Sequence, residues 1–247
     1  MTPCSEAAMR PRIELHEGDC LDILPDLDGD SIDLVLADMP YGTTRCRWDT
    51  LIALEPMWEQ IRRVRKPGAP ILLFGAQPFT SVLNASNLRE FRYDLIWEKP
   101  MATGHLNAKR QPMRAHEHIS VFYDKLGTYN PIKTQGHARK TRKISQTETK
   151  LYGDHAQMPA YDSTARYPRS VQKWTKDNRY KSGHPSQKPI ALLTWLIEAY
   201  SNPGDTILDF AAGSGSTGVA ARQCNRNCIL IEIDPEHCNL ARDRMEL

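Results

Sequence analysis

The chain has 247 residues and a net charge of +2, and this length allows one compact domain with an insertion, or a large and a small domain. Hydrophobic residues make up 40% and charged residues 25%, values typical of globular proteins, which excludes a disordered chain. We find neither a signal peptide nor an apolar stretch of membrane-spanning length, so we expect a cytoplasmic protein. The six cysteines are scattered without a C-x-x-C pair, which predicts reduced thiols and no metal site.

The first part of the chain predicts strands combined with a helix. Residues 54–65 have the apolar spacing of an amphipathic helix. Short apolar segments predict strands at residues 12–18, 31–38, 69–75, 91–98 and 117–124. Because strands that alternate with helices form a parallel sheet covered on both faces, we expect an α/β protein.

The middle of the chain, residues 125–183, lacks sustained periodicity and contains many more basic than acidic residues. Tyrosines and a tryptophan are interleaved with this charge, a mixture that suits phosphate contact and base stacking. The same composition fits a solvated loop insertion that never touches nucleic acid, so both interpretations stay open at this point. The basic residues predicted to contact DNA are Arg139, Lys140, Arg142, Lys143, Lys173 and Arg179.

The last part of the chain again predicts strands and helices in alternation. Residues 189–201 predict a helix, and residues 205–210 predict a strand that ends in a glycine-rich turn. A further strand is expected at 227–234 and a helix at 235–246, which begins with proline. This part therefore contains a β-α-β unit with a glycine loop.

The tetrapeptide Asp38-Met39-Pro40-Tyr41 directly follows an apolar predicted strand, where an open α/β sheet places its ligands. Methylation of an exocyclic amine requires hydrogen bonds that favour a pyramidal nitrogen, because its lone pair is delocalised into the ring. Asp38 can accept one amino hydrogen and the carbonyl of Met39 or Pro40 the other, while Tyr41 offers a ring face for a flipped base. Alone, the tetrapeptide also fits an ordinary turn at the end of a strand.

A second motif, residues 209–218, follows the predicted strand near the C-terminus and has the sequence DFAAGSGSTG. Glycines there allow a ligand to approach the backbone closely, and Glu232 ends the next strand, where a carboxylate would hold ribose hydroxyls. Because this pattern does not separate NAD from S-adenosylmethionine, a nicotinamide-dependent oxidoreductase is the rival interpretation.

Two shorter segments complete the set of candidate binding residues. In the segment HPSQKP, Ser186 could cap the helix that follows, and Ser186 and Lys188 could receive the carboxylate of a methionine moiety. In the segment GDCLD, Asp19 could accept the amino group of a cofactor adenine beside Cys20. Each segment, taken alone, also fits a capped turn.

In this order, the segments DMPY, the basic middle, HPSQKP and DFAAGSGSTG resemble the beta class of amino-methylating DNA methyltransferases, including members from bacteria and phages. The resemblance covers nearly the whole chain, and NAKRQPMRAHEHISVFY and YGTTRCRWDT are similar to phage-type members. It implies a Rossmann-like class I methyltransferase fold in the circularly permuted order. Residues 1–124 would form the catalytic part, 125–183 the target-recognition insertion and 184–247 the S-adenosylmethionine-binding part.

The resemblance also implies a role for each motif. Asp38, Met39, Pro40 and Tyr41 would hold the target amine and base in double-stranded DNA. The cofactor S-adenosylmethionine would contact Asp19, Cys20, Ser186, Lys188, Asp209, Phe210, Ala211, Gly213, Gly215 and Glu232. Met39 departs from the family, which usually has proline there. The aspartate at position 38, where the family's cytosine-N4 enzymes more often have serine, favours methylation of adenine N6 over cytosine N4. The family also implies a bacterial or phage-infected host cell, a possible homodimer and a link to restriction-modification.

Three other classes of protein share some of these motifs. A glutamine-modifying protein methyltransferase has an N-P-P-Y motif, but its cofactor loop precedes that motif, whereas here the glycine loop follows. A nucleic-acid binder without catalysis would need neither Asp38 beside Pro40-Tyr41 nor a cofactor loop. An oxidoreductase is supported by the glycine loop alone.

Overall fold

The computed structural model describes residues 10–42, 50–143, 145–146, 157–158, 160–175 and 187–247. The chain divides into two compact units. The first combines Met1–Asn130 with Ser170–Leu247, and the second comprises Pro131–Arg169.

The first unit is built on an eight-stranded sheet with the strand order β1-β12-β11-β2-β3-β5-β4-β10. The strands are β1 (Ile13–Glu17), β2 (Leu34–Ala37), β3 (Ile71–Gly75), β4 (Phe91–Thr103), β5 (Arg114–Phe122), β10 (Val171–Lys173), β11 (Thr206–Asp209) and β12 (Asn227–Glu232). All neighbouring strands are parallel except that β5 runs antiparallel to both β3 and β4. The expected α/β class is confirmed, and β11 and β12 from the end of the chain lie between β1 and β2 from its start.

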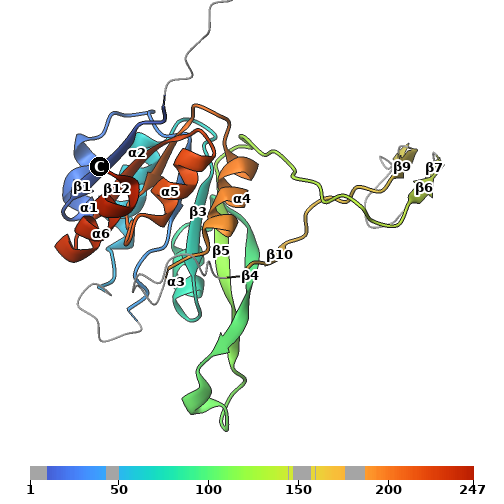
Figure 1. The fold of residues 1–247 in the computed structure, drawn as a ribbon, viewed down its shortest axis with the longest axis horizontal. Helices are drawn as coiled ribbons and strands as arrows, with labels where there is room; N and C mark the ends of the chain where they lie inside the picture. Colours follow the sequence, from blue (N-terminus) through green and yellow to red (C-terminus); the bar gives the residue numbers. More distant parts are fainter. Residues whose placement is uncertain (1–9, 43–49, 144, 147–156, 159, 176–186) are drawn as a thin grey trace, which may run out of the picture. The chain divides into compact units, whose positions relative to one another are not determined.

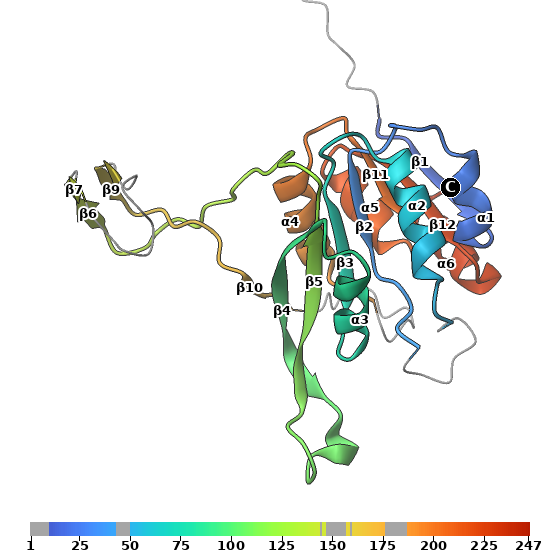
Figure 2. The same cartoon turned by 180° about the vertical axis from the view of Figure 1, so that it is seen from behind.

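Helices cover both faces of this sheet. Figure 1 shows α4 (Ile190–Tyr200), α5 (Ser216–Gln223) and α6 (Pro235–Met245) on one face. Figure 2, seen from behind, shows α2 (Leu54–Val64) and α3 (Phe79–Ser86) on the other, where α1 (Cys20–Ile23) and the short 3-10 helix η1 (Leu24–Asp26) also pack. No helix in the described parts of the chain is long and apolar enough to cross a membrane.

The two faces differ in how their helices are buried. In α2 the buried residues are Met57, Trp58, Ile61 and Val64, which form one apolar stripe at helical spacing. In α4 most side chains are buried, from Ile190 through Tyr200, because this helix packs on the sheet and also against α5. Helix α3 was not predicted, since its segment FTSVLNAS is short and lies directly after a strand.

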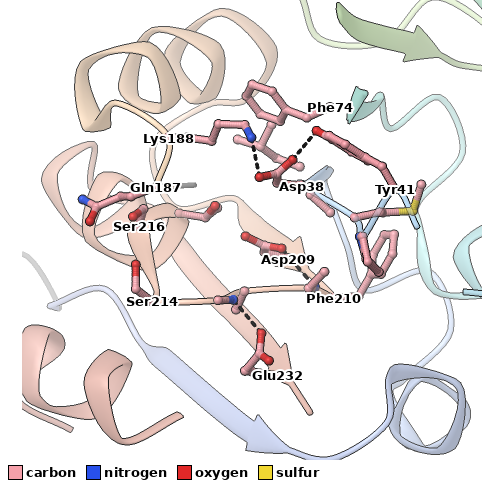
Figure 3. Close-up of a pocket in the computed structure, with 18 of the residues that line it drawn as sticks. Asp38, Tyr41, Phe74, Gln187, Lys188, Asp209, Phe210, Ser214, Ser216 and Glu232 are labelled. Carbon is pink, nitrogen blue, oxygen red and sulfur yellow. Dashed lines mark hydrogen bonds and ion pairs between the residues drawn. The ribbon is translucent and has the colours of Figure 1, made fainter. Parts of the chain in front are cut away.

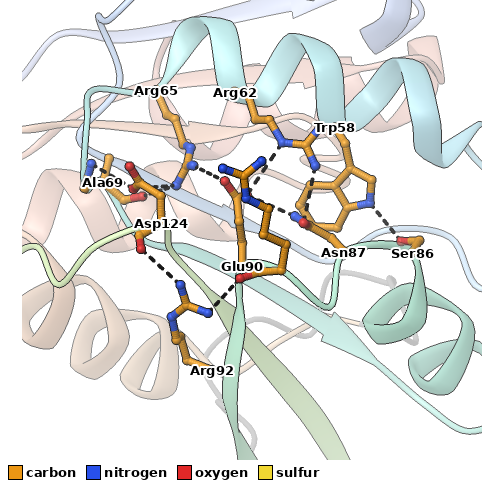
Figure 4. A network of polar contacts seen from close by, with 11 residues as sticks. Trp58, Arg62, Arg65, Ala69, Ser86, Asn87, Glu90, Arg92 and Asp124 are labelled. Atoms are coloured by element: carbon orange, nitrogen blue, oxygen red, sulfur yellow. Dashed lines mark hydrogen bonds and ion pairs between the residues drawn. The ribbon is translucent and has the colours of Figure 1, made fainter.

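A buried ion pair joins α2 to the start of β4 at the amino edge of the parallel strands (Figure 4). Arg65 donates to Glu90 with an Nη2–Oε1 distance of 2.6 Å, and both side chains are less than a tenth exposed. Asn87 donates to the second carboxylate oxygen of Glu90 at 3.0 Å, and Arg65 also reaches the carbonyl of Ala69 at 3.1 Å. These bonds satisfy the charged groups that folding removes from water.

Strands β4 and β5 extend beyond the sheet as a long hairpin, which projects away from the rest of the first unit in Figure 1 and Figure 2. The expected strand at 91–98 continues to Thr103, and the 3-10 helix η2 (His105–Asn107) lies in the turn. A register shift between Glu98 and Thr103 marks the point where the hairpin leaves the regular sheet. Sequence periodicity ends there because the residues beyond have no buried face to alternate with.

The second unit contains short antiparallel pairs rather than the irregular loop that the sequence suggests. Strand β6 (Lys140–Arg142) pairs with β9 (Tyr161–Ser163), and β7 (Ser145–Gln146) pairs with β8 (Gln157–Met158). Strands of two or three residues are too short for a period-two pattern to show in the sequence.

Candidate functional site

A cavity of about 960 Å³ lies at the carboxyl edge of the sheet, where the parallel strands β2, β11 and β12 end. Segments that follow strands at this edge place side chains from distant parts of the chain together. The residues predicted from the sequence that line this cavity are Asp19, Cys20, Asp38, Met39, Pro40, Tyr41, Lys188, Asp209, Phe210, Ala211, Gly213 and Glu232. The predicted catalytic motif and the predicted cofactor loop therefore share one cavity.

The carboxylate of Asp38, directly after β2, accepts hydrogen bonds from two side chains (Figure 3). The phenol of Tyr41 donates to Oδ1 at 2.5 Å, and the ammonium of Lys188 donates to Oδ2. The Tyr41 ring is stacked on Phe79 with their centroids 5.5 Å apart. Both oxygens keep further lone pairs, so Asp38 is held in one orientation and can still accept hydrogen bonds from a ligand.

Lys188 links Asp38 to a second carboxylate, Glu117 on β5. Its Nζ lies 3.1 Å from Glu117 Oε2, and Lys99 Nζ lies 3.1 Å from Glu117 Oε1. Burial disfavours the charge on Glu117, but Lys188 and then Lys99 hold the pKa of Glu117 below its ordinary value. Burial likewise disfavours the charge on Lys188, but Asp38 and then Glu117 hold its pKa above its ordinary value. The cavity wall therefore contains two ammonium groups balanced by two carboxylates.

The glycine loop between β11 and α5 forms the other side of the cavity. Gly213 has a φ of 53°, a conformation that favours glycine, and a Cβ added there would meet no atom within 4 Å. Its backbone N–H donates to Glu232 Oε2 at 2.7 Å, and the N–H of Asp234 donates to Oε1 at 2.9 Å. Glu232 is therefore fixed at the end of β12 facing the loop. An open backbone beside an oriented carboxylate fits a ligand that carries a ribose.

Asp209, the last residue of β11, is buried behind this loop. Burial raises its pKa to about 7, although hydrogen bonds from Thr217 and from the N–H of Ala211 act in the opposite direction. The negative charges of Asp38 and Glu232 raise the pKa further. A cationic ligand in the cavity would favour the ionised form of Asp209.

The remaining predicted cofactor residues differ in their placement. Asp19 caps α1 by accepting from the N–H of Leu21 at 2.9 Å while it lines the cavity beside Cys20. Gly215 does not line the cavity: it precedes α5 with a φ of 74°, and a Cβ there would approach Ala241 to 3.0 Å. Its glycine is explained by the close packing of α5 on α6.

Ser186 lies outside the described residues, so its predicted contacts stay predictions. The N-cap of α4 is Pro189, which makes no side-chain capping bond. Lys188 binds Asp38 and Glu117 in this structure, and its predicted contact with the carboxylate of a methionine moiety stays a prediction.

Several cavity residues were missed by sequence reasoning, among them Phe74, Trp97, Lys99 and Glu117. The sequence did contain a signal for Glu117, because this residue lies on the same face of β5 as Ile119 and Val121, which are fully buried. A carboxylate on the buried face of a strand requires a partner. No pattern in the sequence indicates that the partners would be Lys99 from β4 and Lys188, from just before α4.

The basic residues predicted to contact DNA are distributed over both units. In the second unit, Arg139 forms an ion pair with Asp162 (Nε–Oδ1 2.7 Å), and Arg142 lies over the ring of Tyr161. Lys140 and Lys143 are exposed there. In the first unit, Lys173 on β10 pairs with Glu98 at 2.8 Å. Arg179 lies outside the described residues.

Comparison with known proteins places this chain in a family of methyltransferases. Residues 32–243 match the family N6_N4_Mtase, described as DNA methylase. The chain is 27% identical to the type II methyltransferase M.HpaI of Haemophilus parainfluenzae, over 90% of this chain and 71% of the relative. The structure of the M1.HpyAVI–SAM complex superposes with a TM-score of 0.66 at 20% identity, covering 95% of this chain and 100% of that chain.

A second solved structure is also similar in fold. The cytosine-N4-specific PvuII DNA methyltransferase superposes with a TM-score of 0.69 at 16% identity, covering 95% of this chain and 88% of that chain. The two superpositions confirm the predicted Rossmann-like methyltransferase fold.

Proposed function

Since the chain belongs to the DNA methylase family, which uses S-adenosylmethionine, we propose that it methylates adenine N6 in double-stranded DNA. The family modifies exocyclic amino groups, at adenine N6 or cytosine N4. The rival interpretation, a nicotinamide-dependent oxidoreductase, rests on the glycine loop alone, and the family match does not favour it. The observation that carries the proposal is the oriented carboxylate of Asp38 in the same cavity as Asp209 and Glu232.

Asp38 would accept one hydrogen of the target amino group, and the carbonyl of Met39 or Pro40 would accept the other. These two bonds favour a pyramidal nitrogen, whose lone pair is then available for attack. The hydrogen bonds from Tyr41 and Lys188 keep Asp38 oriented before substrate arrives, which lowers the entropic cost of reaching the reactive geometry. Because a base inside a duplex does not reach such a cavity, the target would be flipped out and packed against Tyr41.

The residues after β11 and β12 would hold the cofactor. Glu232 would accept from ribose hydroxyls, the backbone at Gly213 would lie along the ligand, and Asp19 would accept from the adenine amino group. Bound S-adenosylmethionine supplies a methyl group on a positively charged sulfur. The amino nitrogen of the base, held by Asp38, would take this methyl group from the sulfur and would then lose a proton to solvent.

Adenine is favoured over cytosine because the family's cytosine-N4 enzymes more often begin the catalytic motif with serine, whereas this chain has Asp38. Cytosine N4 is the alternative, and the similarity in fold to the cytosine-N4-specific PvuII enzyme keeps it in view. Met39 replaces the usual first proline of the motif. Its side chain is buried in the core, which supports a motif loop that is held in place by packing instead of by proline.

The basic segment 125–183 would provide target recognition, with Lys140 and Lys143 exposed for phosphate contact. We place the reaction in the cytoplasm of a bacterial or phage-infected cell, with a homodimer as the expected assembly by analogy to relatives.

Incubation with unmethylated genomic DNA and S-adenosylmethionine carrying a labelled methyl group tests the base assignment. After enzymatic digestion, we expect the label in N6-methyladenine. Label in N4-methylcytosine would contradict the adenine assignment and keep the amino-methyltransferase reaction. An absence of label in DNA, from protein that binds the cofactor, would contradict the proposed substrate.

A further inference from the structure

The part of the β4–β5 hairpin that projects beyond the sheet, residues 99–114, has an unusual surface, and we call it the hairpin arm. It contains four basic residues and no aspartate or glutamate. Those basic residues are Lys99, Lys109, Arg110 and Arg114. Its large apolar side chains face solvent: Met101 is 78% exposed and Leu106, in the turn, is 88% exposed. Leu106 is the most exposed large hydrophobic side chain in the described part of the chain.

The hairpin arm begins at the wall of the functional cavity. Residues 99–103 line the cavity together with Asp38 and Tyr41, and Lys99 pairs with Glu117 inside it. The arm extends past the carboxyl edge of the parallel strands, since Gly75, the last residue of β3, pairs with His118 and residues 99–114 lie beyond that pairing. The opposite end of β4, preceded by the turn that contains Leu88 and Arg89, lies at the amino edge.

We propose that the hairpin arm is a second DNA-contacting element, which enters the duplex beside the target base. This inference rests on the proposed function and adds to it a contact surface outside the basic segment 125–183. Lys109 and Arg110 bind phosphates, and Leu106 packs against the bases next to the flipped nucleotide.

Three observations support DNA as the partner of this surface. A nucleotide whose base occupies the cavity remains joined to its duplex, so the duplex must lie across the cavity mouth, where the hairpin arm begins. The arm's positive charge, without any acidic residue, is complementary to a phosphate backbone. Exposed apolar side chains on a cationic protrusion are also the means by which many proteins enter between base steps and unstack them.

The phosphate contacts are tested by direct DNA binding, measured as fluorescence anisotropy of a labelled duplex between about 50 and 200 mM salt. Arg110→Gln should reduce the slope of log affinity against log salt by about 0.9, and Lys109→Gln combined with Arg110→Gln by about 1.8. Arg89→Gln is the matched control, because Arg89 is an exposed arginine at the opposite end of β4, and its slope should equal that of the wild type. Unchanged slopes in the Arg110 variants would refute the phosphate contacts.

The insertion of Leu106 is tested by methyl transfer, once the target sequence is mapped. Leu106→Ser should lower kcat/KM on a fully paired duplex by about tenfold, since an apolar side chain no longer packs against the neighbouring bases to offset the unstacking of the target. A mismatch opposite the target base should restore most of this loss, because the base is then already unpaired. The control Leu88→Ser removes another exposed leucine at the amino edge and should leave both substrates unaffected.

The two measurements distinguish this inference from the proposed function. DNA binding requires no methyl transfer, so a chain that binds DNA through the arm without methylating it would contradict only the proposed function. If Leu106→Ser lowers kcat/KM equally on paired and mismatched DNA, the proposed insertion of Leu106 between the bases is refuted. Normal DNA binding together with a change in oligomeric state for the arm variants would assign the arm to a contact between copies of this chain and overturn the proposal.

Discussion

Replacement of Lys188 by methionine separates two roles for this side chain. The sequence places Lys188 in a motif that resembles a cofactor-binding segment, whereas the structure places its ammonium between Asp38 and Glu117. If Lys188 positions Asp38, Lys188→Met should lower kcat and leave cofactor affinity nearly unchanged. If it binds the cofactor carboxylate, the affinity should fall instead.

The expected size of the effect follows from burial. The side chain of Lys188 is 8% exposed and that of Glu117 is 15% exposed, so removing the lysine leaves carboxylate charge without its partner inside the cavity wall. Loss of one member of a buried ion pair typically costs about 3–5 kcal/mol, and the exposure of Asp38 to the cavity places this case near the lower end. Because a displacement of about 1 Å at a reacting group can cost roughly 100-fold in rate, we expect kcat to fall by about that factor.

Three measurements on Lys188→Met decide between the roles. Urea unfolding gives the loss of stability, calorimetric titration gives the affinity for S-adenosylmethionine, and methyl transfer at saturating substrates gives kcat. We expect a loss of about 3 kcal/mol, an affinity within about threefold of the wild type and a kcat about 100-fold lower. A large loss of affinity with an unchanged kcat would refute the positioning role of Lys188.

Three further predictions concern other parts of the first unit. Affinity for the positively charged cofactor should increase from about pH 6 to about pH 8, because burial raises the pKa of Asp209 to about 7 and the carboxyl ionises above that value; Asp209→Asn should remove this dependence in calorimetric titration. Tyr41→Phe, which removes the donor to Asp38 but keeps the ring, should lower kcat up to about tenfold, less than Tyr41→Ala, in steady-state assays. Glu90→Gln should cost about 3 kcal/mol in urea unfolding and leave kcat per folded molecule unchanged, because the pair with Arg65 lies at the opposite edge from the cavity.

The central part of the fold was predictable because its strands and helices carry strong periodic patterns. Strands such as 34–37 and 71–75 are buried along their whole length, and helix α2 has one continuous apolar stripe. The hairpin arm was not predictable from pattern, because its residues have no buried face and the polarity of neighbouring strands is not encoded in their periodicity. The antiparallel insertion of β5 between β3 and β4 is therefore a difference from the expected parallel arrangement.

The functional residues were predictable where they follow strands in recognisable segments. Asp38, Asp209 and Glu232 each lie at or directly after the end of a strand, and the geometry of a parallel sheet brings such positions to one edge. The partners of Lys188 were not predictable, because Glu117 and Lys188 are far apart in the chain and meet only through the packing of β5 beside the segment before α4. Sequence spacing carries information about local geometry and little about such long-range ion pairs.

The most direct test of the central claim is methyl transfer by the wild type and by Asp38→Ala, measured side by side with cofactor affinity. If the cavity at the carboxyl edge is where a DNA base is methylated, the variant should bind S-adenosylmethionine nearly as well as the wild type and transfer no detectable methyl group to DNA. Full methyl transfer by Asp38→Ala would contradict this claim, because the variant lacks the carboxylate that is proposed to hold the target amino group.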